Sequence, residues 1–181
     1  MLQLRVDGGE FFNDTTEEFY DIKPQKLVLE HSLLSVSKWE SKLQKPFLTT
    51  KFTNSEFIEY IKCMTINTQV NPMIYLCITD KHIKEIDDYI NNPMTATIIR
   101  DPTMINRSRN RIITNELIYY WMLALNIPTE YEKWHLNRLM TLIKICSIEN
   151  DPKKKKMPRS EIYKQNAALN AARRAKAHSK G

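Results

Sequence analysis

The residues best suited to chemistry in this chain are its histidines and one nearby carboxylate. His31, His82, His135 and His178 lie in separate segments, and Glu132 precedes His135 by three residues. A carboxylate and an imidazole at that spacing share one helical face, as in half of a di-metal carboxylate site. Such a site needs a second pair of this kind, and the sequence has no second Glu-x-x-His. We therefore expect no metal site and no cofactor.

Sequence motifs of the common enzyme classes are also missing. The chain has no Gly-x-Ser-x-Gly, no His-Glu-x-x-His, no glycine-rich phosphate loop and no Cys/His set with zinc spacing. Its three cysteines are widely spaced, which favours reduced thiols in the cytosol. The N-terminus lacks the apolar core of a signal peptide, and no stretch is long enough to cross a membrane. We predict a soluble protein that is not an enzyme and has no catalytic residues.

Basic charge is concentrated at the C-terminal end of the chain. Residues 151–181 contain ten basic and two acidic residues, a net charge of +8, whereas residues 1–150 have a net charge of −2. Only this tail is a candidate electrostatic arm. It could bind nucleic acid non-specifically, dock on an acidic protein or serve as a solubilising extension. Arg173 and Arg174 are candidate partner contacts, because guanidinium groups pair bidentately with carboxylates.

The elements that position these residues begin with strands. Residues 1–30 predict a small antiparallel β-hairpin, in which residues 2–6 alternate apolar and polar side chains. Asp7-Gly8-Gly9 would supply the positive φ values of a tight turn, and residues 10–12 would return as the partner strand. Residues 26–30 are a plausible third strand, after a polar connection.

From residue 32 the apolar period becomes helical. We predict a helix that ends before Pro46, a second that starts at a Thr53–Glu56 capping box and a third capped by Asp80. Residues 73–78 are ambiguous between helix and strand. Residues 94–113 read as a loop with four arginines, either solvated or in contact with an acidic partner or nucleic acid.

The strongest helical signal covers residues 115–126 and 130–149. The first of these helices is apolar nearly all round and should be central to the core. The second should begin at a Thr129–Glu132 capping box, so that the two form an antiparallel helical hairpin. After a proline- and lysine-rich linker, residues 160–177 can form an alanine-rich helix that is marginal alone.

The predicted fold class is therefore mainly α (α+β). It consists of a helical domain over residues 1–150, with the N-terminal β-hairpin, and a basic tail over residues 151–181. We expect the tail to be flexible in the isolated protein and to order only against an acidic surface.

Five segments of the chain have distinctive sequences: LEHSLLSVSKWESKLQKPFL (29–48), EYIKCMT (59–65), EIDDYINNPMTAT (85–97), ELIYYWMLALNIPTEYEKWHLNRLMTLIKIC (116–146) and ALNAARRA (168–175). The most distinctive string is Trp-His-Leu-Asn-Arg-Leu at 134–139. These segments resemble a protein family encoded in the tail-gene region of long-tailed bacteriophages (siphoviruses). The family is similar to tail assembly chaperones and carries no catalytic residues.

The resemblance implies a non-catalytic assembly factor that binds the tape measure protein, and possible further partners are the major tail protein and a second copy of the chain. It would act in the host bacterial cytoplasm, without contact with a membrane. The alternatives are a structural component of the virion in the tail or at the head–tail connector, and a phage protein that binds nucleic acid through residues 151–181. Aromatic side chains dominate many interfaces, so the candidate anchors, each of which could instead be core, are Trp39, Tyr60, Tyr120 and Trp134.

Overall fold

The computed structural model describes residues 1–13, 17–99, 112–150 and 159–176. It is mostly helical with small N-terminal antiparallel sheets, so the predicted α+β class is confirmed. The chain divides into two compact units, Met1–Lys144 and Ile145–Gly181. The predicted arginine-rich loop falls largely on residues 100–111, which lie outside the described residues.

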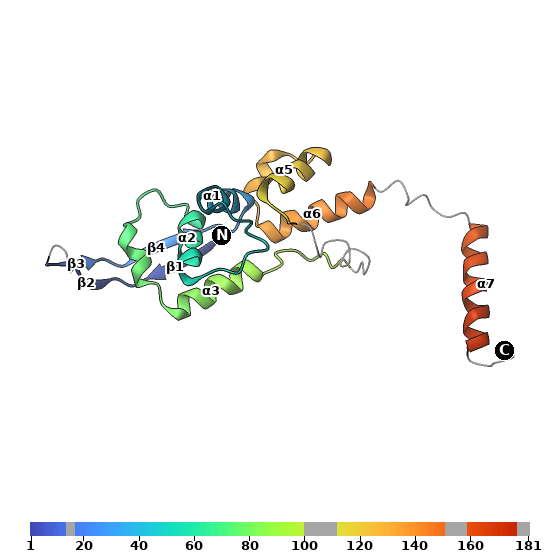
Figure 1. Cartoon of the computed structure of the whole chain (residues 1–181), viewed down its shortest axis with the longest axis horizontal. Coiled ribbons are helices and arrows are strands. Elements are labelled where there is room, and N and C mark those ends of the chain that lie inside the picture. Colours follow the sequence, from blue (N-terminus) through green and yellow to red (C-terminus); the bar gives the residue numbers. More distant parts are fainter. Residues whose placement is uncertain (14–16, 100–111, 151–158, 177–181) are drawn as a thin grey trace. The chain divides into compact units, whose positions relative to one another are not determined.

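The N-terminal strands pair differently from the prediction. β1 (Leu2–Val6) pairs antiparallel with β4 (Gln25–Leu29), and β2 (Gly9–Asn13) pairs with β3 (Glu18–Ile22). Figure 1 shows β2 and β3 running on from β1 and β4, away from the helices. The predicted pairing of residues 2–6 with residues 10–12 is therefore wrong. The segment predicted to be a polar connection is also different, because it contains the strand β3.

Gly8 packs closely against the backbone of the neighbouring strand. A Cβ atom at this position would lie 1.6 Å from the carbonyl oxygen of Ile22, on the strand that runs alongside. Only glycine lets the two backbones approach so closely. Gly8 is thus required for space, and the positive φ of the predicted turn is not what selects it.

One face of the β1–β4 sheet packs against the core. Alternate side chains along these strands are buried, as expected where one face of a sheet is covered: Leu4, Val6, Leu27 and Leu29. The helices α1 (Leu33–Leu43) and α2 (Asn54–Met64) follow. Thr65 and Ile66, just past α2, hydrogen-bond along β4, because Ile66 N donates to the Val28 carbonyl.

Helix starts follow local capping chemistry. Glu56 N donates to the Thr53 hydroxyl and Thr53 N donates to the Glu56 carboxylate, so the predicted capping box is confirmed. The ambiguous stretch is a 3-10 helix, η1 (Pro72–Cys77), and α3 spans Asp80–Asn91. The cap of α3 is Thr79 rather than the predicted Asp80, which lies inside the first turn.

The helices near residue 130 also depart from the prediction. α5 (Asn115–Ala124) buries only one side, so it does not lie at the centre of the core. The 3-10 helix η2 (Thr129–Lys133) follows, and α6 (Leu136–Glu149) begins only after it. η2 interrupts the predicted direct helical hairpin. The predicted Thr129–Glu132 capping box is wrong, because Glu132 instead accepts a hydrogen bond from the Tyr119 hydroxyl.

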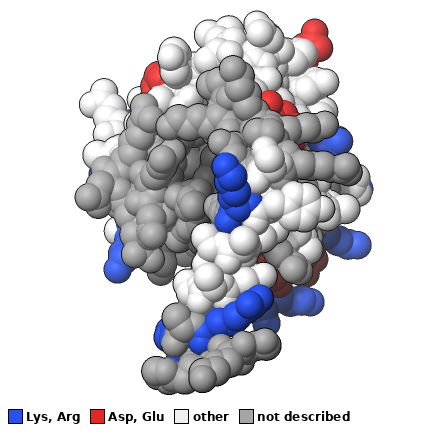
Figure 2. Space-filling view, turned by 90° about the vertical axis from the view of Figure 1, so that its right-hand side faces the viewer, with Lys and Arg blue, Asp and Glu red and all other residues white. Residues whose placement is uncertain are grey.

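The second unit contains α7 (Arg159–Lys176), the predicted tail helix. Its described side chains are exposed. Figure 2 shows Lys and Arg side chains on one face of the molecule. Ordering of the tail only on an acidic partner stays a prediction. Within the described residues, no helix is both long and apolar enough to cross a membrane.

Replacing Gly8 by alanine should destabilise the first unit by roughly 1–3 kcal/mol, because the new Cβ has no space beside Ile22. The matched control is Gly9→Ala, whose Cβ would meet its nearest atom at 3.6 Å, an ordinary contact. That change should alter the free energy of unfolding by less than about 0.5 kcal/mol. Urea denaturation of both variants measures the difference, and equal effects would contradict the close approach.

Candidate functional site

Buried polar side chains meet where β4, α1 and α2 come together. Nδ1 of His31 and the Tyr60 hydroxyl share a hydrogen bond of 2.5 Å. The Ser35 hydroxyl lies 3.2 Å from the same Tyr60 oxygen and donates to the Ser32 carbonyl. All four residues are buried, and Tyr60 has no exposed surface. An imidazole beside two hydroxyl groups could in principle transfer protons, so this cluster is the first candidate for chemistry.

His135 and Tyr89 extend this cluster. The Nε2–H group of His135 donates to the Tyr89 carbonyl at 3.1 Å, and the Tyr89 hydroxyl accepts from the backbone of His31 at 3.5 Å. The centres of the two imidazole rings lie 4.9 Å apart, and the ring planes meet at 67° in an edge-to-face arrangement. Nδ1 of His135 is buried without a hydrogen-bond partner in the described part of the chain.

Burial keeps this cluster uncharged at neutral pH. Desolvation, and secondly the neighbouring imidazole of His135, lower the pKa of His31 to about 3. Desolvation also lowers the pKa of His135 and raises the pKa of the Tyr60 phenol far above its usual range. Because the side chains that share the proton are closed off from solvent, we assign the cluster a structural role.

A second buried polar group fixes the position of α5. Glu40, in the last turn of α1, accepts hydrogen bonds from the backbone of Phe47 at 2.7 Å and from Asn115. The backbone and side-chain nitrogens of Asn115 lie 2.7 and 2.6 Å from the same carboxylate oxygen. Since the backbone N–H group of Asn115 would otherwise be unpaired at the start of a helix, Glu40 caps α5 across 75 residues of sequence.

The candidate metal pair does not assemble. Glu132 lies in η2 and His135 follows it before α6, so the two do not share a helical face. Among the described residues, no group of three or more His, Cys, Asp or Glu side chains could hold a metal ion. Cys63, Cys77 and Cys146 are free.

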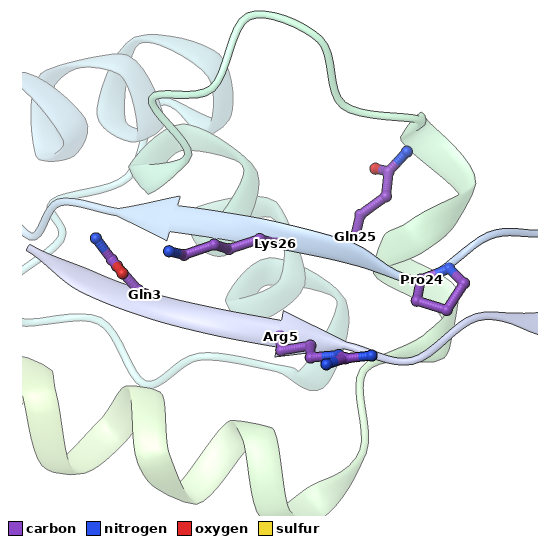
Figure 3. Close-up of a pocket in the computed structure, with 5 residues that line it drawn as sticks. All are labelled: Gln3, Arg5, Pro24, Gln25 and Lys26. Atoms are coloured by element: carbon purple, nitrogen blue, oxygen red, sulfur yellow. The ribbon is translucent and has the colours of Figure 1, made fainter.

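An open depression lies on the outer face of the β1–β4 sheet, with a volume of about 520 Å³ (Figure 3). Gln3 and Arg5 from β1 and Lys26 from β4 project on this side. Gln25 also lines the depression, and its side-chain oxygen accepts a hydrogen bond from Asn71 N, just before η1. Arg5 and Lys26 lie directly opposite each other in the register. Their exposed charges make this a solvated polar surface.

The aromatic residues proposed as partner anchors fall into two groups. Trp39 and Tyr60 are completely buried, and the Trp39 indole donates to the Glu56 carbonyl at 3.0 Å. No surface of either side chain is open to a partner, so we assign both to the core. Trp134 is half-buried, stacks on Tyr131 at 4.0 Å and carries the Arg138 guanidinium 4.0 Å from its ring centre.

Tyr120 is the proposed anchor with the most open surface. It is 63% exposed, and Leu123, one turn further along α5, is 66% exposed. Residues three apart lie on the same side of a helix, so the two form one apolar patch, which we call the α5 patch. Arg173 and Arg174 are exposed on α7. They belong to the second unit, whereas the α5 patch belongs to the first.

Sequence reasoning overlooked the exposed aromatic residues of β2 and β3. Phe12 and Phe19 are opposite one another, with ring centres 4.9 Å apart, and both are exposed. The signal was available in the sequence, since residues 9–22 contain four aromatic residues, five acidic residues and no Lys or Arg. The hairpin prediction concealed it by treating half of this segment as a polar loop.

No protein-family model, curated protein or solved structure matches the chain. The resemblance to phage tail-region proteins therefore stays a prediction.

Acidification should destabilise the fold through His31. Its pKa is about 3 when folded and about 6.5 when unfolded, so between these values the unfolded chain binds the extra proton. The His31 contribution is complete above pH 6.5 and is lost progressively as pH falls towards 3. From pH 7 to pH 5 the loss should be about 2 kcal/mol.

Urea denaturation at several pH values measures this dependence in the wild type and in His31→Asn, which should lose most of it. Ser35→Ala is the control, because it alters the same cluster without removing a titrating group. An unchanged pH dependence in His31→Asn would contradict the assignment.

Proposed function

We propose that this protein is a non-catalytic bacteriophage tail assembly factor that binds the tape measure protein before the tail tube forms around it. The proposal rests on the resemblance of the sequence to tail assembly chaperones. The structural observation that supports it best is the α5 patch, because Tyr120 and Leu123 lie within the longest segment that carries the resemblance.

The α5 patch has the chemistry of a surface that binds a helix. A tape measure protein exposes apolar helical stripes before assembly, and such stripes are recognised by apolar side chains spaced along a groove. Beside the start of α5, a depression of about 460 Å³ is lined by residues of α1 and by Ile112, Thr114 and Glu116. Ile112, which precedes the helix, is also exposed.

The patch is held on a rigid support. Glu40 fixes the first turn of α5 to α1, and Ile118 and Met122 bury the opposite side of the helix. A surface that is ordered before binding loses less conformational entropy when the partner arrives. This favours a binding surface over an enzyme site, since the buried polar groups already serve to hold the fold.

A permanent component of the virion is the alternative role. A transient chaperone should leave the particle, whereas a tail or connector protein should remain in fixed copy number. Quantitative mass spectrometry of purified particles separates the two: we expect no stoichiometric copies. Copies in constant ratio to the major tail protein would reject the chaperone role.

Replacing the α5 patch with Tyr120→Ser and Leu123→Ser should lower recovery of co-expressed tape measure protein on the tagged chain at least about tenfold, since exposed apolar anchors dominate such interfaces. Both side chains are exposed, so the free energy of unfolding should change by less than about 0.5 kcal/mol. Quantitative affinity purification measures the recovery.

A matched control replaces two exposed apolar residues, also three positions apart, in η1: Met73→Ser and Leu76→Ser. This pair should leave recovery of the tape measure protein unchanged. Absence of tape measure binding by the wild-type chain would reject the proposed function. Equal loss in both variants would reject the α5 patch as its site.

A further inference from the structure

The ribbon formed by β2 and β3, residues 9–22, carries an exposed aromatic face that the proposed function does not use. We call it the aromatic ribbon. Phe12 is 50% exposed and Phe19 is 73% exposed, although their rings already contact one another. A projecting two-stranded ribbon gains little stability from so much apolar surface left in water. Such a face is typical of a docking surface.

The register places two carboxylates on the same face as these rings. Side chains two apart in a strand share a face, so Glu10 lies beside Phe12 and Asp21 lies beside Phe19. Glu10 and Asp21 are also direct cross-strand partners. Like charges directly opposite each other destabilise a strand pair, and a cation placed between them removes that cost. The face is therefore suited to a partner that presents an apolar group and a cation together.

This chain contains a helix with that chemistry. In α7, Leu169, Arg173 and Lys176 follow one another at i, i+4 and i+7, which places them along one side of the helix. All three are exposed. Residues 159–176 have a net charge of +4, whereas the aromatic ribbon has a net charge of −5 and no basic residue.

We propose that the aromatic ribbon of one copy binds α7 of a second copy of this chain. Leu169 packs on the rings of Phe12 and Phe19. The guanidinium group of Arg173 lies between Glu10 and Asp21, where a planar cation can pair with carboxylates and contact an aromatic face. The rest of α7 and the acidic residues of the ribbon supply a longer-range attraction.

Such an interface joins two different surfaces of the same chain, so in a pair of copies one keeps a free α7 and the other keeps a free ribbon. Contacts of this heterologous type close into a ring or continue as a chain. The proposal is independent of the role in tail assembly. It also identifies the acidic surface that the basic tail is expected to bind as a protein surface, the ribbon face with Glu10 and Asp21. The same carboxylates would repel the phosphates of nucleic acid.

The test measures the mass of the full-length chain in solution by sedimentation equilibrium, from about 1 µM to about 300 µM, the range of weak and small interfaces. At about 0.05 M salt, the mean mass should rise with concentration above the 21.4 kDa of one chain. At about 0.5 M salt it should fall back towards this value, because the Debye length shortens to about 4 Å.

Two charge-reversed variants locate the contact. Glu10→Lys with Asp21→Lys, and separately Arg173→Glu with Arg174→Glu, should each lower the association constant at least about tenfold. The ribbon variant keeps like charges facing each other, so the stability of the ribbon itself should be similar. Mixing the two variants should restore association between them, because the intact ribbon of the α7 variant can bind the intact α7 of the ribbon variant, and the two reversed surfaces are again of opposite charge.

The control reverses two exposed acidic residues on α3, Glu85→Lys and Asp88→Lys, and should leave association unchanged. Circular dichroism and urea denaturation verify that each variant is folded. The proposal is overturned if the wild type stays at the mass of one chain over the whole range. It is also overturned if the α3 variant is impaired as much as the ribbon variant, or if mixing restores nothing.

Discussion

The hydrogen bond between His31 and Tyr60 is the interaction on which the rest of the first unit depends. His31 joins β4 to α1, and Tyr60 comes from α2. The backbone of His31 adds two further ties, since its carbonyl accepts from Leu136 N at the start of α6 and its N–H donates to Tyr89 of α3. Five elements, three of them distant from His31 in sequence, thus meet around one residue. Because an unpaired polar group at this depth would cost about 1–3 kcal/mol, alternative arrangements of these elements are disfavoured.

This buried cluster has the residue types of a catalytic site but the environment of a core. Desolvation lowers the pKa of His31 and raises the pKa of Tyr60, which leaves both neutral at physiological pH. The same burial that strengthens the hydrogen bonds keeps His31 and Tyr60 out of contact with solvent. The buried core and the Glu40 cap hold the exposed α5 patch in place, so this apolar surface is preformed.

Local chemistry could be predicted from the sequence, and long-range chemistry could not. The Thr53–Glu56 capping box involves residues three apart and was predicted correctly. The roles of Gly8 and Glu132 were predicted wrongly, because partners distant in sequence determine them. Gly8 packs against the Ile22 backbone, and Glu132 accepts a hydrogen bond from Tyr119. Residue type alone also does not separate a core aromatic such as Trp39 from an exposed one such as Tyr120. The ribbon, in contrast, could have been found, since its charge pattern is visible in the sequence.

The aromatic ribbon and the basic helix also link stability to occupancy. Glu10 and Asp21 face one another without a described cationic partner on either strand, so the isolated ribbon bears a like-charge penalty. A ligand that binds only the folded ribbon stabilises it by mass action, and a cationic apolar helix gains most because it removes that penalty. Since the contact depends on exposed charges, it stays weak and reversible at physiological salt. The contact uses none of the residues of the α5 patch, because Tyr120 and Leu123 lie on a different element from the aromatic ribbon.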